Sequence, residues 1–458
     1  MPRFMQVRSS SWWFGSLMAM VLVGEAFGVQ PAAAVDDADN WQTESPREEI
    51  RPQFAFHAKA GRSGNGEWVI EHSQRDGLQG CWYRTVPVEG GQYYRFEAFR
   101  KTRDVADPRR CAVPRILWQD DRGQEVAYDK TVVDFYRSPG SKSLARPEYP
   151  LDAETDSQGW TRVQGSYRAP DSATQARIEL HLRWAPGGRI GWSDIDLVKI
   201  KSPPDRKVKL ATIHFRPSAK SPAGNCRQFA PLIAEAAKQG SDLVVLPETL
   251  TFFGTGASYA ECAESIPGPS TDYFSELAKK HGLYLVVGLL EKNGPLVHNV
   301  AVLIGPEGKI EGKYRKVCLP RGEVEGGITP GKEYPVFKTR FGKVGMMVCY
   351  DGFFPEVARE LTRNGAEVIA WPVWGCNPLL ARARACENHV YLISSTYTDA
   401  KGKWIVSGIY DHTGELKDYA KDWGQVVVVE VDLAKPTYWS GIGDFRAEMT
   451  RHRPAVRE

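Results

Sequence analysis

The spacing of the hydrophobic residues changes once along this chain of 458 residues, close to residue 200. Between 51 and 201, apolar and polar residues alternate in short runs such as YYRFEA at 93–98 and ARIELHLRW at 176–184. Alternation with a period of two is typical of strands that bury one face. Turns rich in Gly, Pro and Asp separate the runs, and no strong helical pattern intervenes. Residues 51–201 are therefore predicted to form an all-β sandwich domain.

The second part of the chain, from 206 to 452, alternates helical and strand-like patterns instead. The segment KSPPDRK at 201–207 marks the joint, because its two prolines end the last β-like run. Strands such as LVVL at 243–246 are apolar at every position, which is expected of strands buried on both faces. Helical patterns such as TDYFSELAKKHG at 271–282 stand between such strands. This part is predicted to be an α/β domain whose helices cover the sheet faces.

The N-terminus carries the pattern of an export signal. Arg3 and Arg8 precede a short apolar run at 12–23, and small residues follow as far as Ala34. This arrangement is typical of a cleaved secretory signal peptide, and the apolar run is short for the alternative, a membrane anchor. We therefore expect residues 1–34 to be a signal peptide and 35–50 a polar linker. The mature protein is expected to be exported, to the periplasm or the extracellular space.

Charge and cysteine spacing argue against several partners. The formal net charge is +3 and no block of Lys and Arg stands out, so nucleic acid is not an expected partner. The eight cysteines show no CxxC and no zinc-like spacing with histidine, so neither a metal nor another cofactor is expected. Because exported proteins form disulfides, Cys81 with Cys111 and Cys226 with Cys262 are candidate pairs.

Three predicted strand ends in the α/β part each carry a reactive side chain. Glu248 follows VVLP, Lys316 follows GKYR, and Cys349 follows VGMMV. A carboxylate, an amine and a thiol are the groups needed to open an amide by covalent catalysis. Each residue alone would more often be a solvated glutamate, a surface lysine or a packing cysteine. Their joint occurrence at strand ends favours an active site.

The order of these motifs resembles the nitrilase superfamily of carbon–nitrogen hydrolases. The matching motifs are a Pro-Glu pair at 247–248, YRK at 314–316 with Leu-Pro at 319–320, and a strand-borne cysteine followed by FPE at 354–356. The resemblance spans about 206–452 and implies a four-layer α-β-β-α sandwich. A hydrolase acting on carbon–nitrogen bonds other than peptide bonds is therefore expected, with the β-sandwich domain in front of it.

The same resemblance implies a role for each reactive residue. Glu248 would be the general base, Lys316 the amine that stabilises the tetrahedral intermediate, and Cys349 the nucleophile that forms a thioester. The turn after the cysteine is expected to aim the backbone N–H of Tyr350 at the substrate carbonyl oxygen.

A second glutamate usually follows the lysine in this superfamily and orients it. The segment PRGEVEGGITPG at 320–331 offers both Glu323 and Glu325. The spacing to the following Pro-Gly favours Glu325, whereas a Pro-x-Gly-Glu pattern seen in some relatives favours Glu323. Of the two, Glu325 is the expected orienting residue. The histidine that usually stands two residues after the lysine is replaced by Cys318, which is expected to be a packing thiol.

The residues after the nucleophile bear on the substrate. Nitrilases proper follow the cysteine with Trp-Glu, whereas Tyr350-Asp351 here resembles the amidases and carbamoylases of the superfamily. The expected substrate is a small amide or N-carbamoyl compound, and Arg321 or Arg382 could supply a cation for a substrate carboxylate. Two alternatives remain: an acyl-transfer enzyme that passes the thioester to an amine, and an exported carbohydrate-binding protein whose hydrolase domain is inactive.

The sandwich part resembles galactose-binding-like jelly rolls. The similarity lies in GWTRVQGSYRAP at 159–170 and GWSDIDLVKI at 191–200. It implies a jelly-roll topology and raises the question of a glycan ligand, since tryptophan rings stack on sugars. The candidate rings are Trp68, Trp82, Trp118, Trp160, Trp184 and Trp192.

The nitrilase resemblance also implies self-association. Domains of this kind commonly pair through the helices that follow the nucleophile strand and the next strand. Here these are the predicted helices at 355–365 and 379–391. A homodimer or a higher homo-oligomer is therefore expected, with the sandwich domains outside its core.

Overall fold

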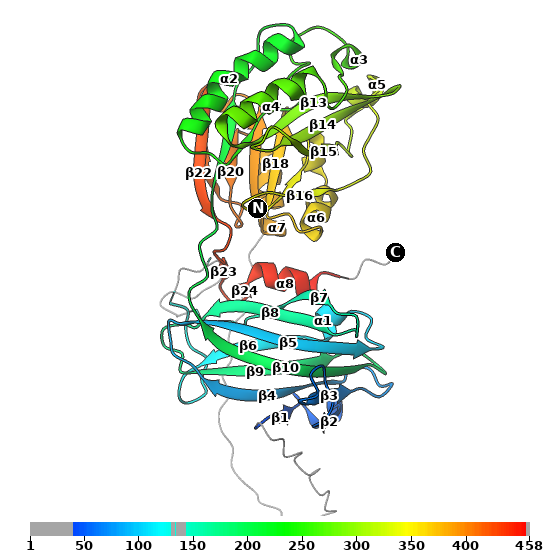
Figure 1. The fold of residues 1–458 in the computed structure, drawn as a ribbon, viewed down its shortest axis with the longest axis vertical. Helices are drawn as coiled ribbons and strands as arrows, with labels where there is room; N and C mark the ends of the chain where they lie inside the picture. Colours follow the sequence, from blue (N-terminus) through cyan, green and yellow to red (C-terminus); the bar gives the residue numbers. More distant parts are fainter. Residues whose placement is uncertain (1–39, 130–132, 134–142, 455–458) are drawn as a thin grey trace, which may run out of the picture.

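The computed structural model describes residues 40–129, 133 and 143–454. The predicted signal peptide at 1–34 and the start of the predicted linker lie outside the described residues. Figure 1 shows a β-sheet domain and an α/β domain, one above the other. Within the described part of the chain, no helix is long and apolar enough to cross a membrane.

The first domain consists of two antiparallel sheets. One sheet has the order β1 (Gln42–Glu44), β4 (Gln79–Pro87), β9 (Gln175–Arg183), β6 (Pro114–Gln119). The other has the order β2 (Gln53–His57), β3 (Glu67–Glu71), β10 (Arg189–Ile200), β5 (Tyr93–Arg103), β8 (Thr161–Arg168), β7 (Leu151–Thr155). The short elements η1 (Glu48–Ile50) and α1 (Pro108–Cys111) complete the domain. Because β1 pairs with β4 from Gln42 onward, the domain begins inside the predicted linker at 35–50, which is therefore shorter than expected.

The alternating pattern marks the core of this domain as predicted. Phe96 and Ala98 on β5 and Ile178 and Leu180 on β9 are fully buried. Five of the six candidate sugar-stacking tryptophans are also buried, and only Trp184 is exposed, at 45% of its surface. Tryptophans inside a core cannot stack on a glycan, so five of the six candidate rings are not available to bind one. The sheet-rich fold is thus confirmed, whereas the galactose-binding-like jelly roll stays a prediction.

The second domain contains two six-stranded sheets. The first has the order β15 (Ile310–Arg315), β14 (Leu296–Ile304), β13 (Tyr284–Asn293), β12 (Leu243–Val245), β11 (Lys207–His214), β22 (Gln425–Asp432). The second has the order β16 (Val336–Lys338), β17 (Lys343–Met346), β18 (Val368–Val373), β19 (Tyr391–Thr396), β20 (Gly408–Tyr410), β21 (Leu416–Tyr419). The main helices are α2 (Pro222–Lys238), α4 (Pro269–His281), α6 (Pro355–Arg363) and α7 (Pro378–Asn388).

Burial on both faces of the strands explains the four layers. Val244 and Leu246 pack in one cluster with apolar residues of α2 and α4, whereas Leu243 and Val245 pack in another cluster with residues of the second sheet. That second cluster continues into the inner faces of α6 and α7. The layer order is therefore helices, sheet, sheet, helices, which is the α-β-β-α sandwich that the sequence predicted.

The directions of the strands bring the expected reactive residues to one edge of the sheets. Strands β11, β12 and β13 run parallel, as do β17, β18 and β19. Glu248 follows β12, Lys316 follows β15, and Cys349 follows β17 and opens the short helix η2 (Cys349–Phe353). Two further short helices, α3 (Tyr259–Cys262) and α5 (Arg321–Glu325), lie beside this edge in the loops.

The last part of the chain returns to the sandwich. It forms β23 (Tyr438–Trp439), β24 (Gly443–Asp444) and α8 (Phe445–His452), and α8 lies across the sandwich in Figure 1. The guanidinium of Arg109, in α1, donates to the carbonyl oxygens of Thr450 at 2.6 Å and Arg453 at 2.7 Å. The two domains are thus joined at two places: through the segment 201–207 and through the C-terminal segment that ends in α8.

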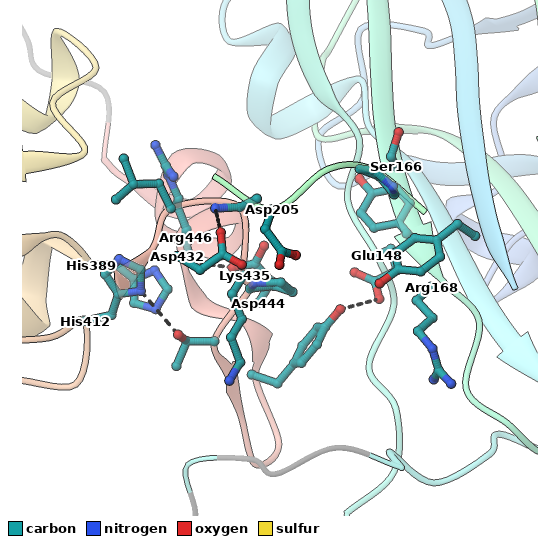
Figure 2. A pocket seen from close by; sticks show the side chains of 18 of the residues that line it. Glu148, Ser166, Arg168, Asp205, His389, His412, Asp432, Lys435, Asp444 and Arg446 are labelled. Carbon is teal, nitrogen blue, oxygen red and sulfur yellow. Dashed lines mark hydrogen bonds between the residues drawn. The ribbon is translucent and has the colours of Figure 1, made fainter. Parts of the chain in front are cut away.

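A pocket of about 410 Å³ lies where the two domains meet (Figure 2). Glu148 and Arg168 line it from the sandwich, and His389, His412 and Arg446 line it from the α/β domain and α8. This pocket contains none of the reactive residues that the sequence singled out.

All eight cysteines are described and all are free thiols. The candidate disulfides Cys81–Cys111 and Cys226–Cys262 do not form, because each thiol is packed elsewhere: Cys226, for example, lies 3.6 Å from the hydroxyl of Ser270.

Candidate active site

A buried lysine joins two carboxylates at the edge of the sheets. The ammonium of Lys316 donates to Oε1 of Glu248 at 2.9 Å and to Oε1 of Glu323 at 2.5 Å. Lys316 is fully buried, and the two glutamates are almost so. A charged amine this deep in a protein requires compensating negative groups. The arrangement therefore holds a cation, with its proton, beside the predicted general base.

Local packing determines where Glu248 lies. Its carboxylate accepts hydrogen bonds from the amide of Asn299 at 2.7 Å and from the backbone N–H of Trp374 at 2.9 Å. Gly288 on β13 allows the chain to pass close by, since a Cβ there would lie 2.6 Å from the Cα of Glu248. These contacts fix both oxygens of the carboxylate before any substrate arrives.

Cys349 occupies a backbone conformation that few residues adopt. Its φ is +40°, in the left-handed region that disfavours side chains with a Cβ. The carboxylate of Asp351 holds this turn by accepting from the backbone N–H groups of Val348 and Cys318 and from the hydroxyl of Tyr314, each at 2.8 Å. The sharp turn after a buried strand is the geometry that the sequence predicted for a nucleophile.

The surroundings of Cys349 favour the protonated thiol over the thiolate. Burial, and then the nearby charge of Glu248, raise the pKa of Cys349 well above its usual value, while Lys316 acts in the opposite direction. The S–H group donates to the carbonyl oxygen of Gly375 at 3.7 Å. Because the thiolate is the reactive form, a base must take this proton during the reaction, and Glu248 is the carboxylate in place.

Lys316 and Glu323 respond to burial in opposite ways. Burial alone would lower the pKa of Lys316, but Glu248, Cys349 and Glu323 outweigh it and raise that pKa. Burial raises the pKa of the Glu323 carboxyl to about 7, with Glu248 adding to the effect and Lys316 opposing it. The lysine is therefore a permanent cation, which suits a group that stabilises negative charge on a substrate oxygen.

The expectation that Glu325 orients the lysine is wrong. Glu325 pairs instead with Arg321 at 2.6 Å, and its side chain is 61% exposed. Both glutamates belong to the one-turn helix α5, and positions two apart on a helix point about 200° apart. Because Glu323 faces inward, Glu325 has to face the solvent. Glu323 takes the predicted position beside Lys316.

A cavity of about 670 Å³ opens onto these residues. Glu248, Glu323 and Cys349 lie in its wall, and so does Tyr350. The predicted role of the Tyr350 backbone N–H toward a substrate oxygen stays a prediction. Cys318 lies outside the cavity wall, and burial, with the Asp351 charge next, raises the pKa of its thiol to about 12, as expected of a packing cysteine.

Three supporting residues were not singled out from the sequence. Asn299 bridges the two carboxylates, since its amide also lies 3.1 Å from Oε1 of Glu323. The backbone of Trp374 binds Glu248, and buried Arg384 donates to the carbonyl oxygens of Gly352 and Phe353 in η2, each at 3.2 Å. Of the three, only Asn299 could have been noticed in the sequence, because it is a polar residue inside the apolar strand HNVAVLI.

One group of potential metal ligands occurs among the described residues, and it lies in the sandwich. Cys81, Glu179 and His181 place one ligand atom each within 4.8 Å of one another. However, Arg115 and Arg177 already donate to the two carboxylate oxygens of Glu179. Two guanidinium groups oppose a further cation, so the donor set fits an ion-paired cluster better than a metal site.

Over its α/β domain, the chain is similar to several known proteins. The carbon-nitrogen hydrolase family model matches residues 209–439. The chain is 42% identical over 199 residues to a nitrilase of Pyrococcus abyssi, covering 41% of this chain and 74% of the relative. It is 34% identical over 251 residues to an omega-amidase NIT2 of Danio rerio, covering 50% of this chain and 89% of the relative. Among solved structures, a nitrilase-superfamily member of Saccharomyces cerevisiae, Nit3, aligns with a TM-score of 0.46 at 25% identity, over 55% of this chain and 96% of that one.

Proposed function

The chain belongs to the carbon–nitrogen hydrolase family, and from that premise we propose that it hydrolyses a small amide or N-carbamoyl compound through a thioester on Cys349. The class of enzyme, a hydrolase of carbon–nitrogen bonds, follows from the family and from its amidase relatives. The observation that carries the finer proposal is the position of Lys316, which is buried between Glu248 at 2.9 Å and Glu323 at 2.5 Å.

The first half of the reaction makes the thioester. Glu248 takes the proton of the Cys349 thiol, and the sulfur attacks the carbonyl carbon of the substrate. Lys316 and the backbone N–H of Tyr350 stabilise the negative oxygen of the tetrahedral intermediate. The carbon–nitrogen bond then breaks as Glu248 returns the proton to the departing nitrogen, which leaves as ammonia or an amine.

The second half releases the acid. Glu248, again ionised, takes a proton from a water molecule, and the resulting hydroxide attacks the thioester carbonyl. The carbon–sulfur bond breaks, the carboxylic acid leaves, and the proton on Glu248 returns to the sulfur. No group outside this chain, the substrate and one water molecule is needed to balance the reaction.

The test is product analysis with a panel of small amides and N-carbamoyl compounds. From each primary amide, wild type should release ammonia and the matching acid in equal amounts. From each N-carbamoyl compound it should release the free amine together with ammonia and carbon dioxide. Cys349→Ala should release none of these. An acyl-transfer enzyme, the main alternative, would instead yield hydroxamate in preference to acid when hydroxylamine is added. Ammonia release that is unchanged in Cys349→Ala would contradict the proposal.

We propose in addition that the enzyme is exported. The support is the sequence pattern of residues 1–34, with its basic start, apolar run and small residues near Ala34. N-terminal sequencing of protein recovered outside the cytoplasm should begin near Val35. Protein that retains Met1 and stays with the membrane would contradict export.

We propose, finally, a homodimer that pairs through α6 and α7. The support is the resemblance to domains that pair in this way, together with the exposed side chain of Leu379 at the start of α7. The other face of α7 is occupied within the chain, because Arg384 is buried against η2. Light scattering on the full chain should give twice the monomer mass, and a monomer at micromolar concentration would contradict the proposal.

A further inference from the structure

Aromatic side chains form a large part of the wall of the active-site cavity. Six of them line it from five different segments of the chain: Phe252, Tyr259, Tyr350, Phe353, Trp374 and Trp404. Several are held by other rings, since Phe252 lies 4.5 Å from Tyr259 and Tyr350 lies 5.2 Å from Phe353, measured between ring centroids. The rings are therefore positioned by the fold and present a preformed apolar surface.

Two of these rings are unusually exposed for their type. Trp404 exposes 53% of its surface and Trp374 exposes 43%. Exposing large apolar rings to water is unfavourable, so grouped exposed rings mark binding surfaces. A ligand in the cavity would remove both from water.

Trp404 lies beside Gly375, the residue whose carbonyl oxygen accepts from the nucleophile. An indole carbon of Trp404 lies 3.6 Å from the position that a Cβ would take on Gly375. The carbonyl oxygen of the same Gly375 accepts from the thiol of Cys349 at 3.7 Å. Trp404 and Cys349 thus both approach Gly375 in the wall of the same cavity.

Apart from Lys316, which is proposed to stabilise the reacting oxygen, the described residues of the cavity wall offer no cation to a substrate carboxylate. Among the described residues that line it, none is Lys or Arg, and its carboxylates are held by buried Lys316. The two arginines that the sequence offered for a substrate carboxylate are engaged elsewhere. Arg321 pairs with Glu325 on the surface, and Arg382 donates to the carbonyl oxygen of Gly414 at 3.0 Å.

We infer that the acyl group of the substrate is uncharged and aromatic, and that Trp404 is the residue that selects it by stacking. A substrate carboxylate would leave water for an apolar wall without a partner, which is costly, whereas a flat ring gains both burial and ring contacts. The inference rests on the proposed function for the identity of the reacting amide, but it concerns binding and does not require turnover.

Binding to Cys349→Ala tests the inference directly. Isothermal titration with phenylacetamide, an aromatic amide, should give an affinity at least about tenfold higher than with succinamate, an amide of similar length that carries a carboxylate. Replacing Trp404 by Ala in the same background should weaken phenylacetamide binding by about tenfold, which corresponds to about 1.4 kcal/mol, and Trp404→Phe should restore part of it.

Trp423 provides the matched control. It is exposed at 41% in the same domain, stacks on His214 and does not line the cavity, so Trp423→Ala should change affinity by less than about twofold. Succinamate binding as tightly as phenylacetamide, or equal affinities with and without Trp404, would overturn the inference. Should Cys349→Ala fail to fold, protection of wild-type Cys349 from iodoacetamide by the same two amides gives the same comparison. A protein that binds phenylacetamide but hydrolyses no amide would contradict the proposed function and leave this inference standing.

Discussion

Cys349 is held in a backbone conformation that is unfavourable for a residue with a Cβ. A φ of +40° costs a residue with a Cβ on the order of 1–3 kcal/mol. Asp351, fully buried, offsets that cost with its three hydrogen bonds, two of which bind the backbone on either side of the active site, at Val348 and Cys318. Strain that is supported in this way aims the thiol at a fixed point, which is what attack on a carbonyl carbon requires.

The two glutamates of α5 give a paired test of the lysine site. Glu323→Gln removes the negative charge 2.5 Å from Lys316, so the lysine should lose part of its alignment with the substrate oxygen. We expect kcat to fall by about 100-fold, a magnitude typical of losing one group that stabilises an oxyanion.

Glu325→Gln is the matched control because it changes the same residue type on the same helix, where the side chain is 61% exposed. Its kcat should stay within about twofold of wild type, since only a surface ion pair with Arg321 is lost. Equal losses in the two variants, measured by steady-state kinetics, would show that Glu323 has no special role.

Glu248 and Cys349 could be predicted from the sequence because each follows an apolar strand, whereas Lys316 follows the mixed strand IEGKYR and was identified from the order of the motifs. The strands before Glu248 and Cys349 lie in different sheets, so the approach of the two residues depends on how the sheets stack, which neither strand pattern reveals. The choice between Glu323 and Glu325 could not be predicted, because it depends on the rotation of a one-turn helix about its axis. Spacing to the next Pro-Gly pair contains no information about that rotation.

Helix α7 supports the nucleophile from a different layer of the fold. Its buried Arg384 donates to Gly352 and Phe353, the two residues that close the turn η2. Gly352 must be a glycine there, since a Cβ would lie 2.1 Å from the ring of Trp371. Helix α7 packs on the second sheet and thus fixes the turn that carries the Cys349 thiol relative to that sheet.

Replacing Arg384 by Met should loosen that turn. We expect kcat to fall by between about tenfold and 100-fold and the free energy of unfolding to fall by about 1–3 kcal/mol, because two buried carbonyl oxygens lose their donor. Arg382→Met, on the exposed side of the same helix, should leave kcat within about twofold of wild type. Denaturant titration together with kinetics on both variants checks this, and an Arg384→Met enzyme with normal kcat would contradict it.

Sequence patterns predicted whether a segment is a helix or a strand better than they predicted which residues surround it. The alternation in β9 correctly marks Ile178 and Leu180 as core, yet Glu179 and His181 on the opposite face are also buried. Burial of the Glu179 carboxylate is compensated by Arg115 of the neighbouring strand β6, which donates to it, and His181 lies 2.8 Å from the same carboxylate. Pairing of this kind depends on which strands are neighbours, and one strand's own pattern cannot reveal it.

The C-terminal segment makes the two domains interdependent. Ala447 of α8 packs in one cluster with Val113 and Tyr149 of the sandwich, and the guanidinium of Arg451 lies 3.8 Å from the ring centroid of Tyr149. The sequence expectation that the sandwich domains lie outside the core of a homodimer does not account for these contacts. Only the long-range packing of α8 reveals them.

A chain beginning at Arg206 should therefore lose protection where α8 loses its partner. Hydrogen exchange at residues 443–453 should become much faster than in the full chain, while exchange in β12 and β17 should remain slow. Slow exchange at 443–453 in the truncated chain would show that α8 is stable without the sandwich.

Two histidines in the pocket between the domains should make the stability of the protein depend on pH (Figure 2). Burial, then His412 and Arg446, lower the pKa of His389 to about 2. Burial and then Arg446 lower the pKa of His412 to about 4, although Asp411 and Glu367 oppose the shift. Since both values lie below the usual 6.5, the unfolded chain binds more protons below pH 6.5.

Stability should accordingly fall as the pH drops from about 6.5 toward 4, by about 1.4 kcal/mol for each unit of pKa lowering. His412→Gln should flatten this fall, because glutamine does not take up a proton. His57→Gln, at an exposed position of the sandwich, should leave it unchanged. Free energies of unfolding measured across this pH range provide the check, and identical slopes for wild type and His412→Gln would contradict the assignment.

The most direct test of the account is the mass of the enzyme during turnover of a slow amide substrate. Intact-protein and peptide mass spectrometry should find the acyl group of the substrate on the peptide that contains Cys349, as a thioester that disappears when substrate is exhausted. Cys318→Ala should form the same adduct, whereas Cys349→Ala should form none and should not release acid. Hydrolysis without an adduct on Cys349, or by Cys349→Ala at a rate close to that of wild type, would contradict covalent catalysis by this residue.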